Sequence, residues 1–391
     1  MTEVLFLAHS FPRSPADPVG SFVLRLAVAL RDEDFIVRVV APSAPGLVES
    51  EEFEGIPVRR FRYAPGRLET LAYSGTMLAQ ARGSRLGGAL ITAFTVANIA
   101  AAFSASRRRR PALIHAHWWF PGGLVGSACA ALRGVPLVTT LHGSDIRAAR
   151  SSPLATRLFR GVLRRSTRVT TVSRWLADET RAVAPGVAPV VAPMPVAPAL
   201  FHPGVARDRD RVLFVGKLNV QKGIFHLLSA LTHMRARPRV DIVVGVGSDA
   251  NEVRPLAASL GVEAQLHFHP LLSQAELATL YRAATVLAAP MTGEGLGLVA
   301  IEAALSGMPV VAFASGGLTD VVVDRRTGLL VPPGDAGALA QALDELLAMP
   351  DQGAALGAAG RLYALETFAP AAVAHRYAMI YREAIEAFPS R

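Results

Sequence analysis

The chain has 391 residues, of which 51% are hydrophobic and 18% are charged, with one cysteine and a formal net charge of +9. This length predicts two domains of about 190 residues each, and the composition argues against long disordered stretches. The single cysteine, Cys129, excludes an internal disulfide framework and suits a reducing, cytoplasmic compartment.

The first half of the chain predicts alternating strands and helices, which are typical of an α/β domain with a parallel, doubly wound sheet. The N-terminal residues lack a basic segment and a long apolar core, so they predict a buried first strand and not a signal peptide. The expected strands are residues 4–8, 36–41, 57–61, 112–117, 137–141 and 168–172. The expected helices are residues 22–31, 69–104 with a break near 83–88, 123–132, 154–164 and 174–183.

One expected helix contains 21 residues without a charge, at 86–106, which is long enough to span a membrane. Its glycines, threonines and alanines make the segment only weakly lipophilic. It also precedes an expected strand, where an α/β domain needs a packed helix. The pattern therefore favours a buried or interfacial helix over a spanning one.

Prolines break any helix across residues 184–210, so this region predicts an interdomain linker. The second half restarts with a strand at 212–215, and a last helix at 370–388 opens with a proline, which a first helical turn tolerates. These features predict domains at 1–190 and 211–367, a linker at 191–210 and a C-terminal helical segment at 368–391.

A glycine-rich turn in the second half carries two carboxylates. Its sequence is Glu294-Gly-Leu-Gly-Leu-Val-Ala-Ile-Glu302, between an apolar strand and a helical pattern. Such a turn lets backbone N–H groups approach an anion, and the helix N-terminus adds partial positive charge. Carboxylates do not bind phosphate, so their expected partners are hydroxyls, and a ligand with hydroxyls at both ends and phosphates between them is a sugar nucleotide. The alternative is an ordinary βα turn with two solvated glutamates.

This segment resembles the E-x7-E signature of retaining glycosyltransferases of the GT4 type, and the resemblance continues from Gly316 to Asp335. The family has the GT-B fold, in which two Rossmann-like, doubly wound domains face each other across a cleft. The resemblance implies transfer of a sugar, with retention, from a nucleotide-diphosphate sugar to a glycan or lipid-linked acceptor. It associates the acceptor with domain 1–190 and the nucleotide sugar with domain 211–367, and it implies that the C-terminal helix crosses back to the first domain.

In the second domain the resemblance assigns the donor phosphates to Lys217 and Lys222, in a strand-to-helix turn that starts at Gly216. It assigns the nucleotide ribose to Glu302 and the donor sugar to Glu294. A covalent intermediate on Glu294 would suit a hydrolase with a carboxylate pair, whereas the family is thought to react on one face of the sugar. Further contacts to phosphate, sugar or acceptor are expected from Gly295, Leu296 and Gly297.

In the first domain, His142 follows a strand and precedes a glycine, which resembles the family's HG motif and implies a catalytic contact with the donor sugar. Asp145 could orient the sugar or the acceptor, or it could cap the next helix, and the cap is the preferred interpretation. Gly20 lies in a proline-rich loop, 11–21, that resembles the family's loop over the donor phosphates. The family often has a glycine pair there, and this chain has Gly20 followed by Ser21.

His115 and His117 share one face of a strand, so a metal site is conceivable. No carboxylate or cysteine cluster accompanies them, and the family generally needs no metal, so we expect neither a metal nor a cofactor. Trp118 could form part of a platform for sugar or acceptor, and aromatic core packing is the alternative. Gly245 and Gly247 form a G-x-G turn, which alone is weak evidence for dinucleotide binding.

Positive charge is concentrated in residues 1–200, which hold 24 Lys+Arg and 13 Asp+Glu, against 16 and 18 in the remainder. Arginine clusters of this kind could bind an anionic membrane leaflet or nucleic acid, or they could form a solvated surface without a partner. Membrane binding is the preferred interpretation. The expected partners are a UDP- or GDP-linked sugar, a glycan or lipid-linked acceptor and the inner membrane leaflet, but no nucleic acid. Two other function classes stay open: a sugar-nucleotide epimerase with the same fold, and a catalytically silent subunit that binds nucleotide sugar or membrane.

Overall fold

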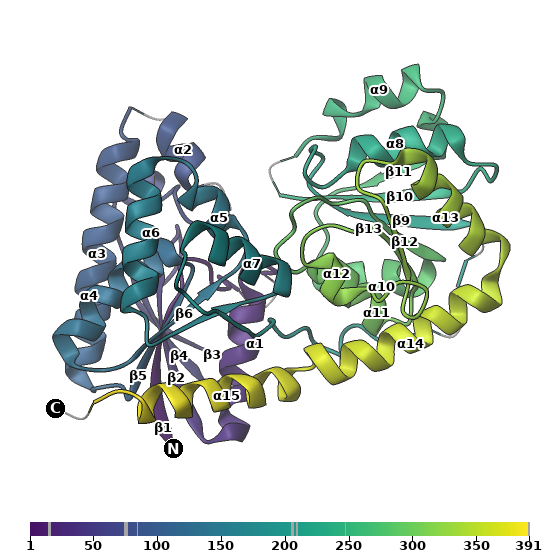
Figure 1. Cartoon of the computed structure of the whole chain (residues 1–391). Helices are drawn as coiled ribbons and strands as arrows, with labels where there is room; N and C mark the ends of the chain where they lie inside the picture. Colours follow the sequence, from purple (N-terminus) through teal and green to yellow (C-terminus); the bar gives the residue numbers. More distant parts are fainter. Residues whose placement is uncertain are drawn as a thin grey trace. The chain divides into compact units, whose positions relative to one another are not determined.

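The computed structural model describes residues 1–14, 17–73, 77–83, 85–204, 207–208, 210–246 and 248–389 of the chain. The chain forms two compact units (Figure 1). Unit 1 comprises Met1–Pro195 and Pro370–Arg391, and unit 2 comprises Val196–Ala369. The first division lies inside the segment expected as a linker, and the C-terminal helix belongs to unit 1.

Parts of five predicted features lie outside the described residues: the loop 11–21, the helical region 69–104, the linker, the glycine turn at 245–247 and the C-terminal segment 368–391. The residues concerned are Pro15, Ala16, Ser74, Gly75, Thr76, Ser84, Val205, Ala206, Arg209, Gly247, Ser390 and Arg391.

Unit 1 is built on a sheet of eight strands in the order β3-β4-β2-β1-β5-β6-β7-β8. Neighbouring strands are parallel, except that β3 and β4 are antiparallel. All six predicted strands are present. The strands are β1 (Thr2–Leu7), β2 (Phe35–Pro42), β3 (Ser50–Phe53), β4 (Ile56–Phe61), β5 (Leu113–His117), β6 (Leu137–Leu141), β7 (Arg168–Thr171) and β8 (Val190–Val191). The sequence did not predict β3, which is polar and largely exposed, or β8, which has two residues.

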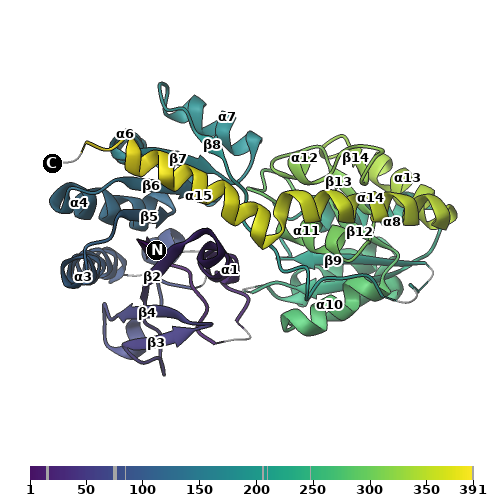
Figure 2. The same ribbon diagram turned by 90° about the horizontal axis from the view of Figure 1, so that it is seen from below.

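Helices cover both faces of this sheet (Figure 2). On one face α3 and α4 pack together, and on the other face α1 contacts α15, which also contacts β5 and β6. The helical elements of unit 1 are α1 (Ser21–Ala29), η1 (Leu30–Glu33), η2 (Gly66–Leu68), α2 (Met77–Gly83), α3 (Gly87–Arg108), η3 (Trp119–Gly123), α4 (Leu124–Arg133), α5 (Ser144–Ala149), α6 (Pro153–Arg165), α7 (Arg174–Val183) and α15 (Pro370–Glu386).

The helical region expected from residue 69 begins later than predicted, because residues 69–73 form a loop. The carboxylate of Glu69 accepts a hydrogen bond from the Tyr63 amide (3.3 Å), and the Tyr63 hydroxyl accepts one from the Leu71 amide (3.0 Å). Leu71 and Tyr73 are buried in the core under α3. Tertiary burial and side-chain hydrogen bonds therefore override the helical pattern here.

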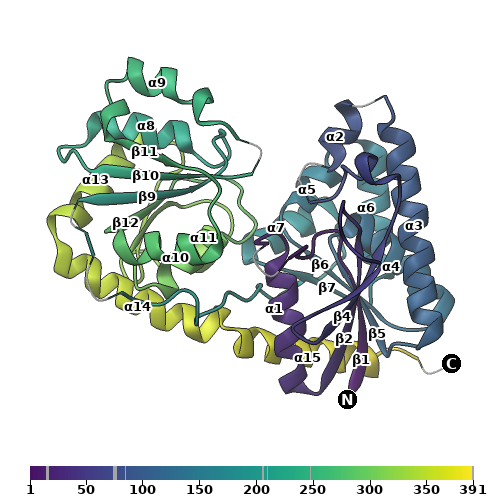
Figure 3. The same ribbon diagram turned by 180° about the vertical axis from the view of Figure 1, so that it is seen from behind.

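Unit 2 contains a parallel sheet of six strands in the order β11-β10-β9-β12-β13-β14. The strands are β9 (Arg211–Gly216), β10 (Arg239–Val244), β11 (Leu266–His269), β12 (Val286–Ala289), β13 (Val310–Phe313) and β14 (Leu329–Val331). On one face α8 packs with α13, and on the other α11 packs with α10 and α14 (Figure 3). The helical elements are α8 (Ile224–His233), η4 (Ala250–Glu252), α9 (Arg254–Ser259), η5 (Glu263–Gln265), α10 (Gln274–Ala283), α11 (Leu298–Leu305), α12 (Leu318–Val321), α13 (Ala336–Ala348) and α14 (Pro350–Phe368).

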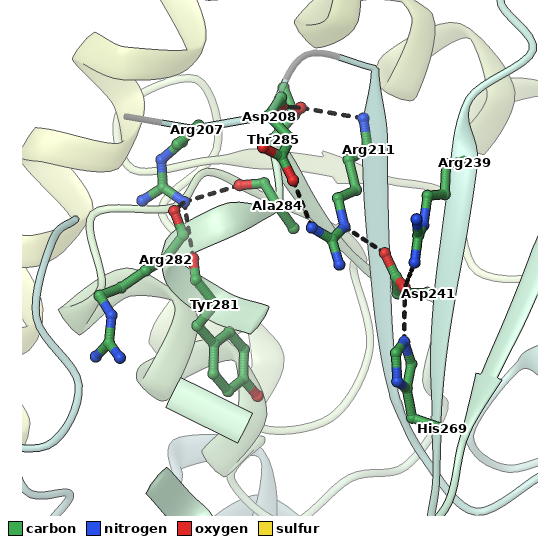
Figure 4. Close-up of polar contacts among 10 residues, drawn as sticks. All are labelled: Arg207, Asp208, Arg211, Arg239, Asp241, His269, Tyr281, Arg282, Ala284 and Thr285. Carbon is green, nitrogen blue, oxygen red and sulfur yellow. Dashed lines mark hydrogen bonds and ion pairs between the residues drawn. The ribbon is translucent and has the colours of Figure 1, made fainter. Parts of the chain in front are cut away.

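A partly buried arginine fixes the C-terminal end of α10 (Figure 4). The Arg207 guanidinium donates hydrogen bonds to the carbonyl oxygens of Tyr281 (2.8 Å), Ala284 (2.8 Å) and Ser306 (2.6 Å). Burial lowers the pKa of Arg207 to about 10, so it remains charged at neutral pH. The contacts position α10 beside α11, which matters for the site described below.

A second cluster ties β9, β10 and β11 together through Asp241, whose side chain is fully buried in β10 (Figure 4). Its carboxylate forms ion pairs with Arg211 of β9 and with Arg239 (3.2 Å), and it contacts the His269 ring of β11 (2.6 Å). A buried carboxylate is tolerated because three partners share it.

Candidate active site

The glycine-rich turn of unit 2 joins β12 to α11 and is held by its neighbouring loops. The Thr292 amide donates to the Gln221 carbonyl (2.9 Å), and the Gly317 amide donates to the Glu294 carbonyl (2.7 Å). Gly297 caps α11 with φ +90°, and a Cβ there would lie 2.7 Å from a leucine side chain, so glycine is required. The turn is therefore fixed beyond the carboxyl ends of β9 and β12, where doubly wound sheets bind ligands.

The two predicted phosphate-binding lysines lie in the loop between Gly216, at the end of β9, and α8. Lys222 donates to Glu294, with 2.5 Å between Nζ and Oε2, and the two side chains are 24% and 22% exposed. Lys217 forms no ion pair with any residue in the described ranges. The structure thus brings together Lys222 and Glu294, which are far apart in the sequence.

The same loop contains every lysine of the chain. The sequence has 40 Lys+Arg residues, and only Lys217 and Lys222 are lysines. A lysine presents a compact point charge on a flexible stem, whereas arginine presents a rigid planar fork. The sequence uses arginine at every other Lys/Arg position, so lysine is restricted to this loop.

The amides of Gly295 and Leu296 precede α11 and donate to no acceptor within the part of the chain that the structure describes. They add partial positive charge beside the Lys222–Glu294 pair, as the N-terminal end of α11 does. The turn therefore combines ammonium groups, available amides and one carboxylate. This set can bind a diphosphate together with a hydroxyl group.

Glu302 lies inside α11 and is 8% exposed. Its Oε2 accepts a hydrogen bond from the Tyr281 hydroxyl (2.9 Å) of α10, the helix whose end Arg207 fixes. Burial and the nearby Glu302 charge raise the pKa of Tyr281 well above its usual value, so the hydroxyl stays a donor. The sequence did not indicate this role of Tyr281, because the contact joins two helices.

In unit 1, Asp145 does not cap α5, the helix in which it lies, so the cap interpretation is wrong. The N-cap is Gly143, without a side-chain bond. Instead Asp145 Oδ2 accepts from the His142 amide (2.6 Å), and Oδ1 accepts from the Trp119 amide (2.9 Å). The carboxylate therefore ties the loop after β6 to the loop after β5. Burial raises the pKa of Asp145 to about 6, which leaves it mainly ionised at neutral pH.

The His142 ring is partly buried and belongs to a cluster of aromatic rings, of which His117 is fully buried. Its Nε2 lies 3.2 Å from Nδ1 of His117, and its ring centroid lies 4.2 Å from that of Trp118. Burial lowers the pKa of His142 well below the usual value, and it lowers the pKa of His117 to about 3 and that of His9 to about 4. Within unit 1, His142 is therefore a neutral hydrogen-bonding group at pH 7.

Trp118 is packed within this cluster rather than presented as a platform. Its side chain is 8% exposed, and its ring lies against His9 as well as His142 (centroid distances 4.3 and 4.2 Å). Its backbone has φ +63°, which is uncommon for a residue other than glycine. The arrangement agrees better with aromatic core packing, the alternative interpretation of this residue.

Family profiles match two adjoining parts of the chain. The profile described as Glycosyltransferase Family 4 matches residues 19–200, and the one described as Glycosyl transferases group 1 matches residues 200–363. A D-inositol 3-phosphate glycosyltransferase of Frankia alni is 35% identical over 304 residues, which cover 70% of this chain and 74% of the relative. The chain belongs to glycosyltransferase family 4.

Other relatives agree with this assignment. An MMP alpha-(1->4)-mannosyltransferase of Mycolicibacterium hassiacum is 34% identical over 276 residues, or 65% of this chain and 67% of the relative. Sucrose-phosphate synthase from Thermosynechococcus elongatus has the same fold, with a TM-score of 0.83, 24% identity and coverage of 99% and 100% of the two chains. Anabaena HepE in complex with UDP and glucose has a TM-score of 0.75, 18% identity and coverage of 98% and 100%. The protein is thus a retaining glycosyltransferase with the GT-B fold.

In this glycosyltransferase Gly20 has a clear structural role. It caps α1 with φ +74°, and a Cβ there would lie 2.5 Å from the Ser10 carbonyl oxygen. The loop between β1 and α1 can close against itself only with glycine at this position. Its predicted contact with donor phosphate stays a prediction.

His115 uses both ring nitrogens within unit 1. Nε2 lies 2.6 Å from the Thr140 hydroxyl, and Nδ1 lies 2.6 Å from the Tyr381 hydroxyl of α15. Neither nitrogen is therefore available to a metal that His117 could share. Across the described ranges, no group of three or more His, Cys, Asp or Glu side chains could hold a metal ion.

Proposed function

We propose that this glycosyltransferase takes a UDP- or GDP-linked sugar as its donor. The observation that carries the proposal is the Lys222–Glu294 ion pair beside the N-terminal end of α11, with Lys217 in the same loop. A diphosphate needs fixed cations near its oxygens, and a sugar needs acceptors for its hydroxyls. The complexes of HepE with UDP and with UDP-glucose, a protein similar in fold, support a uridine nucleotide as the first candidate.

The nucleotide would be bound by groups of unit 2. Lys217 and Lys222 hold the diphosphate together with the amides of Gly295 and Leu296. Glu302 accepts hydrogen bonds from the ribose hydroxyls, while the contact with α10 fixes its Oε2.

In unit 2 the sugar would be bound by Glu294, and the contact of neutral His142 with the sugar stays a prediction from the resemblance to the family. In the transfer, the bond between the anomeric carbon and the phosphate oxygen breaks, and the acceptor oxygen bonds to that carbon on the same face. The acceptor proton passes to the departing phosphate. Lys217 and Lys222 stabilise the charge that develops on the leaving nucleoside diphosphate, which supports the proposal that no metal or other cofactor takes part.

We further propose a glycan or lipid-linked acceptor at the inner membrane leaflet, with the protein in the cytoplasm and peripheral to the membrane. The excess of positive charge in residues 1–200 supports it. A phosphorylated polyol is a second candidate acceptor, because several relatives are D-inositol 3-phosphate glycosyltransferases. Transfer assays with a lipid-linked glycan and with an inositol phosphate separate the two.

The donor proposal is tested by melting temperature with UDP, GDP, ADP, CDP and TDP. A nucleotide at 100 times its Kd adds about 2.7 kcal/mol to the apparent stability. We expect UDP or GDP to raise the melting temperature of the wild type and not that of Glu302→Ala. If no nucleotide stabilises the wild type, the donor site is assigned wrongly.

The two lysines allow an independent test. An amine-specific reagent can modify only Lys217, Lys222 and the amino group of Met1 in this chain. We expect the nucleotide that stabilises the protein to protect both lysines, while Met1 serves as an internal control that reacts equally with and without nucleotide. Equal labelling of all three amines in the presence of a bound nucleotide would exclude the lysines from the phosphate site.

A further inference from the structure

Helix α3 presents an apolar face to solvent. By length and composition it is the one helix among the described residues that could cross a membrane, yet only 28% of its most apolar window is buried in the protein. Its buried residues, including Phe94, Ala101 and Ala105, lie on one side. Val96 and Ile99 lie on the opposite side and are 61% and 37% exposed.

The exposed side follows the helical period. We name as the α3 face the exposed apolar and weakly polar residues that recur at intervals of three and four along it, namely Ala89, Thr92, Val96, Ile99 and Ala100. The Thr92 hydroxyl donates to the Gly88 carbonyl within the helix (3.0 Å). This back-bonding satisfies the only side-chain polar group of the face, so the face can leave water at little cost.

Both ends of the α3 face are basic. Arg85 precedes the helix, Arg107 and Arg108 end it, and all three are exposed. A cavity of about 520 Å³ beside the helix is lined by Arg59 and Arg62 as well as by α3 residues. The sequence from residue 70 to 144 contains seven arginines and no Asp or Glu. Carboxylates from outside this segment pair with Arg109 (Glu3) and with Arg59 (Glu49), whereas Arg85, Arg107 and Arg108 form no ion pair within the described ranges.

We propose that the α3 face is a membrane-docking surface, which lies in the plane of an anionic leaflet with its apolar side chains inserted among the acyl chains. An in-plane helix buries one apolar face in the headgroup and acyl boundary and places basic residues at the phosphates, and α3 has this distribution. The inference rests on the membrane part of the proposed function and not on the identity of the donor.

Other arrangements of α3 fit less well. The helix does not span the bilayer, because its other face is packed in the core of unit 1 with Phe61 and Ile114. A second copy of the chain, paired through α3 in either direction, would bring Arg85, Arg107 and Arg108 towards the like charges of its partner with no carboxylate between them. Phosphate headgroups, in contrast, complement both ends.

The test is flotation of the full chain with vesicles of phosphatidylglycerol and phosphatidylcholine at low salt. We expect the wild type to float, and the double variant Val96→Glu/Ile99→Glu to bind at least about tenfold more weakly. The matched control is Leu256→Glu/Leu260→Glu in unit 2, which adds the same charge at two exposed leucines and should float as the wild type does. Unchanged melting temperatures establish that both variants fold.

A second readout separates insertion from simple attraction. An environment-sensitive dye on Val96→Cys, in a Cys129→Ala background, should report an apolar environment on vesicles, whereas the same dye on Leu362→Cys of α14 should not. If the wild type floats but the α3 variant floats equally well, the α3 assignment is overturned and the membrane proposal stands. If the wild type does not float, the α3 assignment and the membrane proposal are both overturned, while the donor-site proposal is unaffected. If the α3 variant instead converts a dimer to a monomer, the face is an interface between copies.

Discussion

Lys222 and Glu294 of unit 2 are charged and partly exposed, whereas His142, the predicted sugar-binding residue of unit 1, is a neutral and partly buried histidine in a cluster of rings. Lys222 and Glu294 neutralise each other across 2.5 Å. His142 has no ion pair within the described residues and is held by a backbone hydrogen bond to Asp145 and by ring contacts. We therefore expect the residues of unit 2 to act through their charge and those of unit 1 through their position.

Among the variants that change the charged residues of unit 2, Glu294→Gln should have the largest effect. We expect kcat to fall roughly a hundredfold or more, because a contact to the reacting sugar is lost. We also expect nucleotide diphosphate to bind up to about fivefold more tightly, because Lys222 no longer pairs with a carboxylate and half-exposed ion pairs are worth at most about 1 kcal/mol. Initial rates and titration calorimetry measure the two effects.

Lys222→Ala is the matched control for this prediction. It removes the other member of the pair and should weaken nucleotide binding. If Glu294→Gln weakens binding as much as Lys222→Ala does, the two residues act together on the nucleotide and do not compete.

Glu302→Gln tests the ribose contact with a smaller effect. We expect the Kd for the nucleotide to rise by roughly tenfold to a hundredfold, because a hydrogen bond to a charged group is lost. Tyr281→Phe should raise it only about fivefold, since it removes the hydroxyl that holds Glu302 and not the carboxylate itself. Equal effects of the two variants would mean that Tyr281 contacts the nucleotide directly.

Asp145→Asn tests whether Asp145 positions the loop that contains His142. One of the two backbone amides, of His142 or Trp119, would then face an NH2 group, so we expect kcat to fall about tenfold and the melting temperature to decrease. Nucleotide binding should not change, because the carboxylate lies in unit 1 and the nucleotide contacts lie in unit 2. A raised nucleotide Kd with normal kcat would contradict the positioning role.

The ring cluster also predicts how stability depends on pH. Burial lowers the pKa values of His9, His115, His117 and His142 below the value of an unfolded histidine, so unfolding takes up protons below about pH 6.5. Their contribution to stability is present above that pH and is lost as the pH falls. Asp145 acts in the opposite sense, because its pKa is raised to about 6, but it is one group against four.

We therefore expect unit 1 to lose on the order of 1 kcal/mol per pH unit for each net proton between pH 6.5 and 5. All three tryptophans, Trp118, Trp119 and Trp175, lie in unit 1, so their fluorescence in a urea titration reports this unit alone. His117→Asn should make the dependence less steep. An unchanged slope in that variant would show that His117 is not neutral in the folded state.

Much of this protein is determined by local sequence. The alternation of apolar strands and helices is enough to predict both α/β units, and the Glu294–Glu302 turn is enough to indicate the family, because a strand, a glycine turn and a helix start depend on neighbouring residues. Asp145 shows the limit of this reasoning. Its position before a helix suggested a cap, but its carboxylate bonds to the amide of Trp119, from another loop.

Contacts between distant segments could not be predicted, because their energy depends on which surfaces the packed sheets bring together. Tyr281 holds Glu302, and Lys222 holds Glu294, only because α10, α11 and two loops meet beside the same sheet. The exposure of α3 was decided in the same way. Its composition favoured a buried or interfacial helix over a spanning one, and only the packing of Phe94 into unit 1 shows that Val96 and Ile99 remain in solvent. Local sequence is thus enough to indicate the family and the charged residues, whereas the partners of these residues depend on the fold, since burial and long-range contacts exist only in the folded chain.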